Sequence, residues 1–131
     1  MPSSRHQPIL NVLAEHPEIR LAILFGSLAG DLAGPDSDLD LAVAADHPLS
    51  AEAKMTLMGE LAVATGRPVD LVDLNTVGEP LLGQILAHGL RLCGSDEGYA
   101  RLVTRHLLDE ADFMPYYRRI LAERRRAWIG R

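Results

Sequence analysis

The sequence predicts an α/β fold, in which helices pack on one small sheet. Short apolar runs typical of buried strands alternate along the chain with longer stretches typical of helices. Glycine, proline and other turn residues separate the two kinds of segment. The strand-like runs cover residues 18–25, 38–45, 68–74 and 90–93, and we expect the last to be a short edge strand.

The first third of the chain contains three further segments with local signals. A helix is predicted over residues 4–16, because the apolar residues from Ile9 to Leu13 form a stripe. A short helix or helical turn is expected over residues 27–32. The Gly-Pro-Asp-Ser sequence at 34–37 predicts the turn that leads into the second strand.

The rest of the chain carries clear helix boundaries. The predicted helices cover residues 51–64, 79–88, 96 to about 113 and 115 to about 128. Ser50 and Ser95 are the expected N-caps of the first and third of them. Gly66 ends the first helix and Gly89 ends the second. Pro115 should kink or restart the last helical segment.

Length and composition predict a single domain. The chain has 131 residues, of which 47% are apolar and 24% charged, so it can bury a real core. We expect one domain over residues 1–131, with a sheet region at about 17–94 and C-terminal helices at 95–131. We find no repeat and no low-complexity segment.

The cysteine and histidine content argues against disulfide and zinc frameworks. Cys93 is the single cysteine and has no internal partner. The five histidines are scattered, without the spacing of zinc ligands. The N-terminus lacks the apolar region of a signal peptide, and no apolar run approaches membrane-spanning length. These features predict a cytoplasmic protein with no membrane partner.

Charge is distributed unevenly along the chain. The net charge is −5, but residues 115–131 hold six arginines and one glutamate, so they carry +5 and the remainder carries −10. An acidic body disfavours nucleic acid as a direct partner, because affinity for nucleic acid comes mainly from neutralising phosphates. The basic end could touch nucleic acid, but its arginines and Trp128 favour a protein partner, since Arg and Trp are enriched in interface hot spots.

The most informative motif spans the first two predicted strands. Gly26 ends the first strand, where a glycine lets the backbone approach a ligand closely. Ser27 can cap a following helix, whose N–H groups would form an anion site. Asp38 and Asp40 stand two apart on the second strand, so their carboxylates share one face. A phosphate cradle facing paired carboxylates indicates metal-dependent phosphoryl or nucleotidyl transfer.

A third carboxylate is expected from the third predicted strand. Asp70 lies inside its apolar run, where an unpaired charge would be costly. Asp73 lies at the end of the run and points to the opposite face. We therefore predict Asp70 as the third acid, although a register error of one residue would exchange the two.

Each part of this pattern also has an explanation without chemistry. A Gly-Ser pair after a strand is often only a turn. A strand with one wet face would explain Asp40 and Asp70 as solvated side chains. The three parts occur together and in the right order, and this conjunction favours the functional interpretation.

At these residues the chain resembles the minimal nucleotidyltransferases (MNT) of the DNA polymerase beta-like superfamily. The resemblance is carried by GSLAGDLAGPDSDLDLAV at 26–43 and VDLVDL at 69–74. It implies a polymerase beta-like nucleotidyltransferase fold, with a small mixed sheet and a C-terminal helical appendage. It also implies two Mg²⁺ ions held by catalytic acids at Asp38, Asp40 and Asp70, and contacts to ATP from Gly26, Ser27 and Ser37.

The chain departs from the family pattern just after the Gly-Ser pair. Many members carry arginines there, whereas this chain has Leu28 and Ala29 followed by Gly30 and Asp31. The loop itself therefore lacks an obvious cation for the phosphates.

The resemblance further implies a function and a partner. MNT proteins typically pair with a HEPN-domain ribonuclease toxin and neutralise it as antitoxins, by transferring AMP from ATP to a tyrosine hydroxyl of the toxin. The chain is too short for a separate acceptor domain, so we expect a hetero-oligomer in which the partner completes the site. The expected docking residues lie in the C-terminal helices and are Tyr116, Tyr117, Arg118, Arg125 and Trp128.

Two alternatives remain open from the sequence. A non-catalytic antitoxin would neutralise its partner by binding alone, which the missing loop arginines favour and the three acids disfavour. A small-molecule nucleotidyltransferase, acting on an aminoglycoside-like acceptor, would need no protein partner, and the missing acceptor domain disfavours it.

Overall fold

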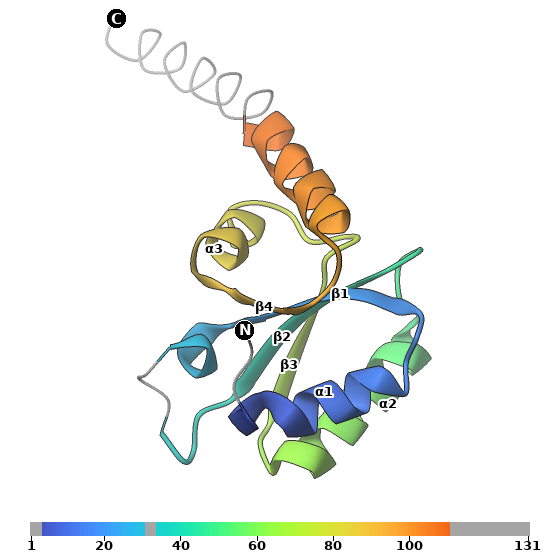
Figure 1. Cartoon of the computed structure of the whole chain (residues 1–131), viewed down its shortest axis with the longest axis vertical. Helices are drawn as coiled ribbons and strands as arrows, with labels where there is room; N and C mark the ends of the chain where they lie inside the picture. Colours follow the sequence, from blue (N-terminus) through green and yellow to red (C-terminus); the bar gives the residue numbers. More distant parts are fainter. Residues whose placement is uncertain (1–3, 31–33, 111–131) are drawn as a thin grey trace, which may run out of the picture.

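The computed structural model describes residues 4–30 and 34–110. In chain order its elements are η1 (Ser4–His6), α1 (Gln7–Ala14), β1 (Ile19–Phe25), η2 (Gly26–Ala29), β2 (Leu39–Ala45), α2 (Ala51–Thr65), β3 (Val69–Asp73), α3 (Leu81–His88) and β4 (Leu90–Cys93). The elements η1 and η2 are short 3₁₀ turns. A further helix covers 96–110 and is drawn in orange in Figure 1.

The four strands form one mixed sheet in the order β3-β2-β1-β4. β1 runs antiparallel to both β2 and β4, whereas β2 and β3 run parallel to each other. The parallel pair requires a long crossover, and α2 provides it. β4 lies at the edge of the sheet, so the predicted fold class and the predicted edge strand are both confirmed.

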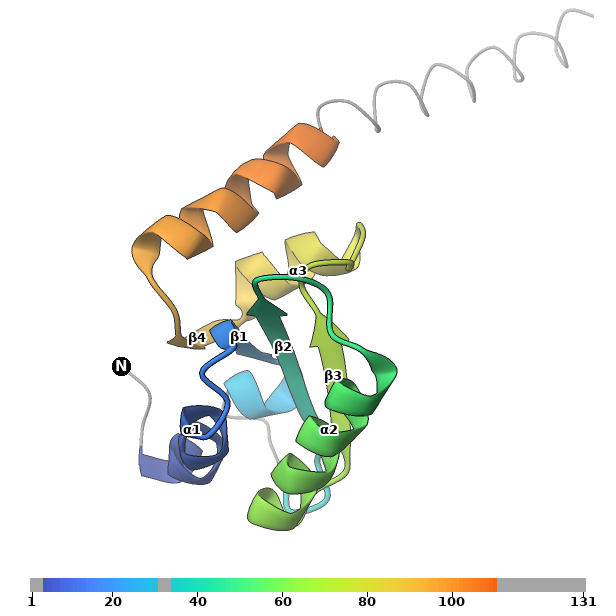
Figure 2. The same ribbon diagram turned by 90° about the vertical axis from the view of Figure 1, so that its right-hand side faces the viewer.

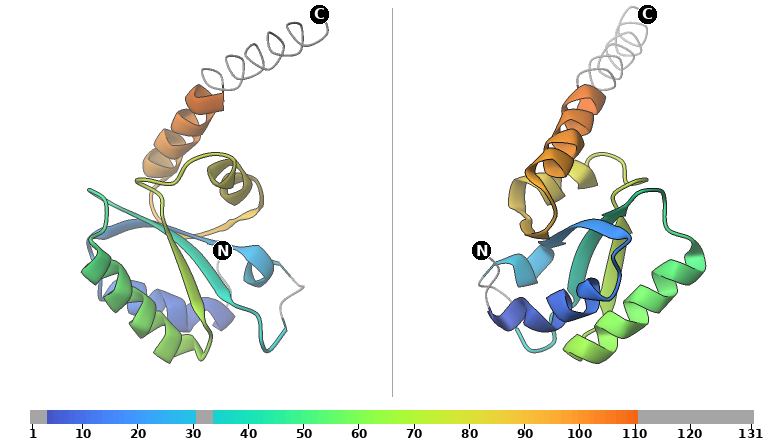
Figure 3. Two further views of the ribbon diagram at one scale, coloured as in Figure 1. Left: turned by 180° about the vertical axis from the view of Figure 1, so that it is seen from behind. Right: turned by 45° about the vertical axis from the view of Figure 1, so that its right-hand side comes forward.

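Helices cover both faces of the sheet. α1 and α2 lie on one face, and α3 and the helix over 96–110 lie on the other (Figures 1 and 2). The view from behind and the oblique view in Figure 3 show the same two layers. Since successive side chains of a strand point to opposite faces, Leu41 joins the core beneath α1 and α2, whereas Ala42 joins the core beneath α3.

The helix boundaries follow the capping residues in the sequence. The Ser50 hydroxyl accepts a hydrogen bond from Ala53 N at 3.0 Å, which begins α2. Gly66 ends that helix with φ +68°, in the left-handed region that glycine adopts readily. The Ser95 hydroxyl likewise accepts from Gly98 N at 3.0 Å.

Most predicted strands and several predicted helices differ from the structure by a few residues at their ends. The first predicted helix, 4–16, is a 3₁₀ turn followed by α1, which ends at Ala14. The helix predicted over 79–88 is α3, which begins at Leu81 because Pro80 occupies its N-cap position. The predicted helical turn at 27–32 is η2, which begins one residue earlier at Gly26. Within the described ranges, no helix has the length and apolar character needed to cross a bilayer.

An ion-pair cluster connects the turn after α1 to α2. His16 contacts Glu60 on α2 through Nε2 and Glu18 through Nδ1, the latter at 3.1 Å. The hydrogen bond to Glu60 is the main reason why the pKa of His16 lies above its ordinary value of 6.5. The folded state therefore binds the proton more tightly than the unfolded state. This stabilisation is complete below the unfolded pKa and is lost as the pH rises through the folded pKa.

Replacing His16 by glutamine should therefore change the pH dependence of stability. We expect wild type to exceed H16Q in free energy of unfolding in mild acid, by up to about 1 kcal/mol as is usual for exposed ion pairs. The difference should vanish on the alkaline side. Urea denaturation of both proteins from about pH 5.5 to about pH 8.5 measures it, and a difference independent of pH would contradict the assignment.

Candidate active site

Strand register brings the predicted acids together at one end of the sheet. Asp40 in β2 is the direct partner of Asp70 in the parallel strand β3. Asp40 and Asp70 each stand two residues before a side chain that packs beneath α3, Ala42 and Val72, so their carboxylates project from that face of the sheet. The prediction that Asp38 lies on the second strand is wrong, because β2 begins at Leu39 and Asp38 is an exposed residue just before it. The sequence predicted only that a third acid lies near the first two, and the strand register places Asp70 directly opposite Asp40.

The three carboxylates act on one another electrostatically. The pKa of Asp40 is raised above its ordinary value of 3.8, first by burial and then by the charges of Asp70 and Asp38. A half-buried carboxylate beside two other carboxylates is destabilised in its ionised form. A divalent cation would remove this repulsion, and carboxylate oxygens are the ligands that Mg²⁺ prefers. The residues present therefore fit a Mg²⁺ site.

Asp70 differs from its predicted environment. It was predicted as a charge inside an apolar strand, but its side chain is exposed. Desolvation therefore does not distinguish it from an ordinary surface aspartate. Its position opposite Asp40 distinguishes it, and that position depends on strand pairing.

The backbone of Gly26 lies directly against the carboxylate of Asp40. Phe25, the preceding residue, pairs with Asp40 across β1 and β2. Gly26 has φ +71°, and a Cβ built on it would stand 2.2 Å from Asp40 Oδ2. Any larger residue would both be strained and displace the carboxylate. The glycine thus leaves the space beside Asp40 open.

The two predicted serines both lie in the connection between β1 and β2, which leads to Asp38 and Asp40. Ser27 is exposed in η2, and its carbonyl accepts from Gly30 N at 3.3 Å. The expectation that Ser27 caps a following helix is wrong, since η2 begins at Gly26 and has no side-chain cap. Ser37 closes the turn before Asp38, because its hydroxyl accepts from Gly34 N at 2.8 Å.

Asp73 has a structural role on the other face of the sheet. It is buried, and its two carboxylate oxygens accept hydrogen bonds from Leu49 N and Asn75 N, each at 2.8 Å. These bonds hold the chain just before α2 and just after β3. Because β3 alternates, Asp73 points away from Asp40, which supports the choice of Asp70 as the third acid.

Sequence reasoning missed two residues whose side chains hydrogen-bond the backbone between β1 and β2. Arg67 donates from Nη1 to the carbonyl oxygens of Gly34 and Ser37, at 3.0 and 2.7 Å. His6 is 5% exposed and hydrogen-bonds the backbone of Leu28 in η2, while burial is the main cause that lowers its pKa. Both side chains line a cavity of about 360 Å³. Their partners lie far away in the sequence, so no local signal could have indicated them.

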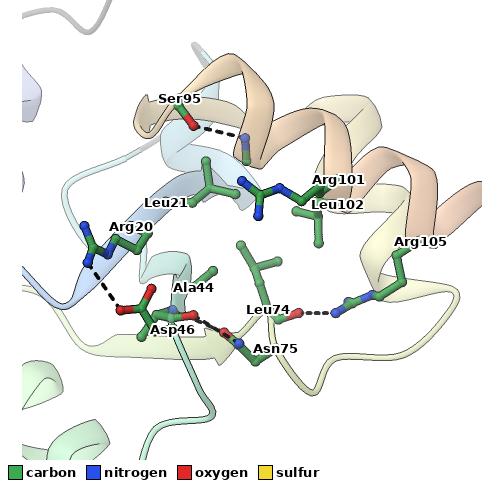
Figure 4. A pocket seen from close by; sticks show the side chains of 12 residues that line it. Arg20, Leu21, Ala44, Asp46, Leu74, Asn75, Ser95, Arg101, Leu102 and Arg105 are labelled. Carbon is green, nitrogen blue, oxygen red and sulfur yellow. Dashed lines mark hydrogen bonds and ion pairs between the residues drawn. The ribbon is translucent and has the colours of Figure 1, made fainter.

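Two other groups of polar residues lie away from the acids. Glu79, His106 and Glu110 approach one another closely, and His106 Nδ1 lies 2.5 Å from Glu79 Oε1. A cavity of about 670 Å³ lies at the opposite end of β1 and β2 (Figure 4). There Arg20 pairs with Asp46, and Arg105 donates to the carbonyl of Leu74 at 2.6 Å. These contacts hold the helix over 96–110 and the strand ends in place.

Comparison with known proteins gives close relatives for this arrangement. The chain is 34% identical over 90 residues to the protein adenylyltransferase MntA of Shewanella oneidensis, a match covering 68% of this chain and 65% of that protein. A crystal structure of a toxin–antitoxin with AMP-PNP is similar with a TM-score of 0.72 and 29% identity, over 98% of this chain and 97% of that one.

A second solved structure contains a modified toxin. It is a tri-AMPylated Shewanella oneidensis HEPN toxin in complex with an MNT antitoxin, matched with a TM-score of 0.66 and 28% identity, over 96% of this chain and 93% of that one. The family model described as Polymerase beta, Nucleotidyltransferase matches residues 7–98, which include the three acids, Gly26 and both serines. The chain therefore belongs to the polymerase beta nucleotidyltransferase family.

Proposed function

We propose that this chain is a cytoplasmic antitoxin that transfers AMP from ATP to a tyrosine hydroxyl of a cognate HEPN ribonuclease toxin. The observation that carries the proposal is the convergence of the Gly26 backbone, Asp40 and Asp70 at one end of the sheet. Likeness to MntA and to complexes that contain a HEPN toxin supports a protein acceptor.

The proposed roles of the site residues follow from their positions. Asp38, Asp40 and Asp70 would hold Mg²⁺, which supplies charge stabilisation for the attacking and leaving oxygens. Gly26, whose backbone lies beside Asp40, would let the triphosphate approach. Ser27 and Ser37, both in the connection between β1 and β2, would contact its oxygens.

The proposed transfer is an in-line displacement at the α-phosphorus of ATP. The tyrosine oxygen forms a bond to that phosphorus, and the bond to the oxygen bridging to the β-phosphate breaks, so pyrophosphate leaves. Asp70 accepts the phenolic proton. Its exposure makes it accessible to a side chain of a partner protein, whereas the half-buried Asp40 is not so placed.

The direct test follows label from α-³²P-ATP to the purified product of the adjacent gene, with Mg²⁺ present. We expect label on the partner with wild type and none with Asp38→Asn. Label on a small acceptor in place of the partner would indicate a small-molecule nucleotidyltransferase and contradict the proposal.

Binding without catalysis is the second candidate function. It is favoured by Leu28 and Ala29, which stand where many family members carry arginines. It predicts a stable complex with the partner, no transfer of label, and full neutralisation by Asp40→Asn. The same labelling experiment distinguishes the two functions.

We also propose that the toxin docks through the C-terminal helices. The predicted docking residues Tyr116, Tyr117, Arg118, Arg125 and Trp128 lie outside the described residues. In the described part of this region, Leu107 and Leu108 are 60% and 57% exposed on the helix over 96–110. Exposed leucines next to one another are suited to burial by a partner.

Replacing Leu107 and Leu108 by aspartate should weaken the complex with the toxin. Burial of one leucine contributes about 1.5–3 kcal/mol, so we expect the Kd to rise at least about tenfold. Isothermal titration of the toxin into wild type and into each variant measures the Kd. The matched control is Val63→Asp on α2, where Val63 is 87% exposed. If that control weakens binding equally, the docking face lies elsewhere.

A further inference from the structure

The turn before Asp38 is held by an arginine from a distant part of the chain. Arg67 follows Gly66 at the end of α2, and it donates from one nitrogen to the carbonyls of Gly34 and Ser37 at 3.0 and 2.7 Å. Within the turn, Ser37 N donates to the Gly34 carbonyl at 3.2 Å and Gly34 N donates to the Ser37 hydroxyl. The turn is therefore held both by its own hydrogen bonds and by hydrogen bonds from Arg67.

Asp38 stands between two anchors that come from the same segment. On its N-terminal side, Arg67 holds the carbonyl of Ser37. On its C-terminal side, Leu39 N donates to the carbonyl of Pro68 at 2.8 Å. Residues 67 and 68 lead directly into β3, which carries Asp70. One short segment thus connects the backbone on both sides of Asp38 to the strand of the third acid.

We propose that Arg67 is a positioning residue, which fixes Asp38 relative to Asp40 and Asp70 for metal binding. Because Asp38 is a metal ligand only under the proposed function, this role rests on that function. The three acids come from separate backbone positions, and Asp38 precedes the regular strand. Its place therefore depends on the turn, while Asp40 and Asp70 are held by the sheet.

The chemistry of arginine suits this task. A guanidinium is planar and rigid, and its nitrogens can donate to two carbonyls at fixed angles. Lysine offers a point charge on a flexible stem, which can reach one carbonyl without fixing the direction of both. Groups that orient metal ligands typically change metal affinity about 10-fold to 100-fold when they are removed.

The test compares Arg67→Met with wild type in the full chain. Methionine keeps the apolar stem and removes both hydrogen bonds. Mn²⁺ is titrated in the presence of AMP-PNP and followed by electron paramagnetic resonance. We expect the Kd for Mn²⁺ to rise about tenfold or more, and Arg67→Lys to recover part of the loss. In hydrogen exchange, the Ser37 amide should lose protection in R67M.

The matched control is Arg20→Met. Arg20 is an exposed arginine whose guanidinium pairs with Asp46 at the other end of β1. The R20M variant should therefore bind Mn²⁺ with the affinity of wild type. A lowered melting temperature of R67M with unchanged Mn²⁺ affinity would make Arg67 merely structural and overturn the proposal. If R67M fails to fold, unchanged Mn²⁺ affinity in R67K together with faster exchange at Ser37 would overturn it.

The same titration separates this proposal from the proposed function. A wild type that binds Mn²⁺ and AMP-PNP but labels no partner would contradict AMP transfer, while the comparison of R67M with wild type would still decide the role of Arg67. A wild type that binds no Mn²⁺ with AMP-PNP would overturn the positioning role itself.

Discussion

Asp40→Asn should lower the rate of AMP transfer by about a thousandfold or more. A metal ligand at the reacting centre contributes several kcal/mol to the transition state, and about 4 kcal/mol corresponds to a thousandfold in rate. At the same time the folded protein without metal should become more stable. The pKa of Asp40 is raised by burial and by Asp70 and Asp38, so its ionised form opposes folding at neutral pH.

The sign of this stability effect can be tested directly. A raised carboxyl pKa means that the folded state binds the proton more tightly, so Asp40 destabilises wild type once the pH exceeds its folded pKa. We expect a higher melting temperature for D40N than for wild type at pH 7 without metal. Mg²⁺ with AMP-PNP should stabilise wild type and leave D40N unchanged. A D40N protein that melts lower than wild type without metal would contradict the electrostatic assignment.

Asp73→Asn is the matched control on the same sheet. Both oxygens of Asp73 accept backbone hydrogen bonds at 2.8 Å, and an asparagine would direct its NH₂ group at one of those N–H donors. Losing such a bond to a charged group costs about 1.5–3 kcal/mol. D73N should therefore be destabilised yet still transfer AMP when folded. Loss of transfer in folded D73N, with retention in Asp70→Asn, would reverse the roles of the two acids.

Gly26→Ala should reduce AMP transfer by about a hundredfold or more. The new Cβ would stand 2.2 Å from Asp40 Oδ2, so the carboxylate must move, and a displacement of about 1 Å costs about a hundredfold in rate. The backbone adds a cost of about 1–3 kcal/mol in stability, because a residue with a side chain is strained at φ +71°. Label transfer and urea denaturation measure the two effects.

Two glycine controls separate the contact of the new Cβ with Asp40 from the backbone strain at positive φ. Gly66 shares the left-handed conformation, with φ +68°, but a Cβ there meets nothing within 4 Å, so G66A should lose stability without disturbing Asp40. Gly30 follows η2, and a Cβ built on it also meets nothing within 4 Å. G30A should therefore change neither the rate of AMP transfer nor the stability strongly. Equal loss of transfer in G30A would mean that the whole loop is sensitive, rather than the contact between Gly26 and Asp40.

Local sequence signals predicted the elements and most of their ends. The apolar runs placed β1 to β4, and Ser50, Gly66 and Ser95 marked helix ends, since these signals depend on residues a few positions apart. The start of α3 shifted to Leu81 because Pro80 takes the N-cap position. Boundaries of this kind depend on detailed backbone geometry, which a pattern of residue types describes only approximately.

The sequence by itself determined the residues that we propose for the chemistry: a glycine at a strand end, two aspartates two apart, and a third on a later strand. Only the tertiary structure decided that Asp40 pairs with Asp70, that Asp73 accepts hydrogen bonds from the backbone of Leu49, and that Arg67 holds the turn before Asp38. The physical reason is the range of the interactions. Residue type and periodicity act within one segment, whereas strand register and the partner of a long side chain depend on segments about 30 residues apart, which meet only when the sheet forms.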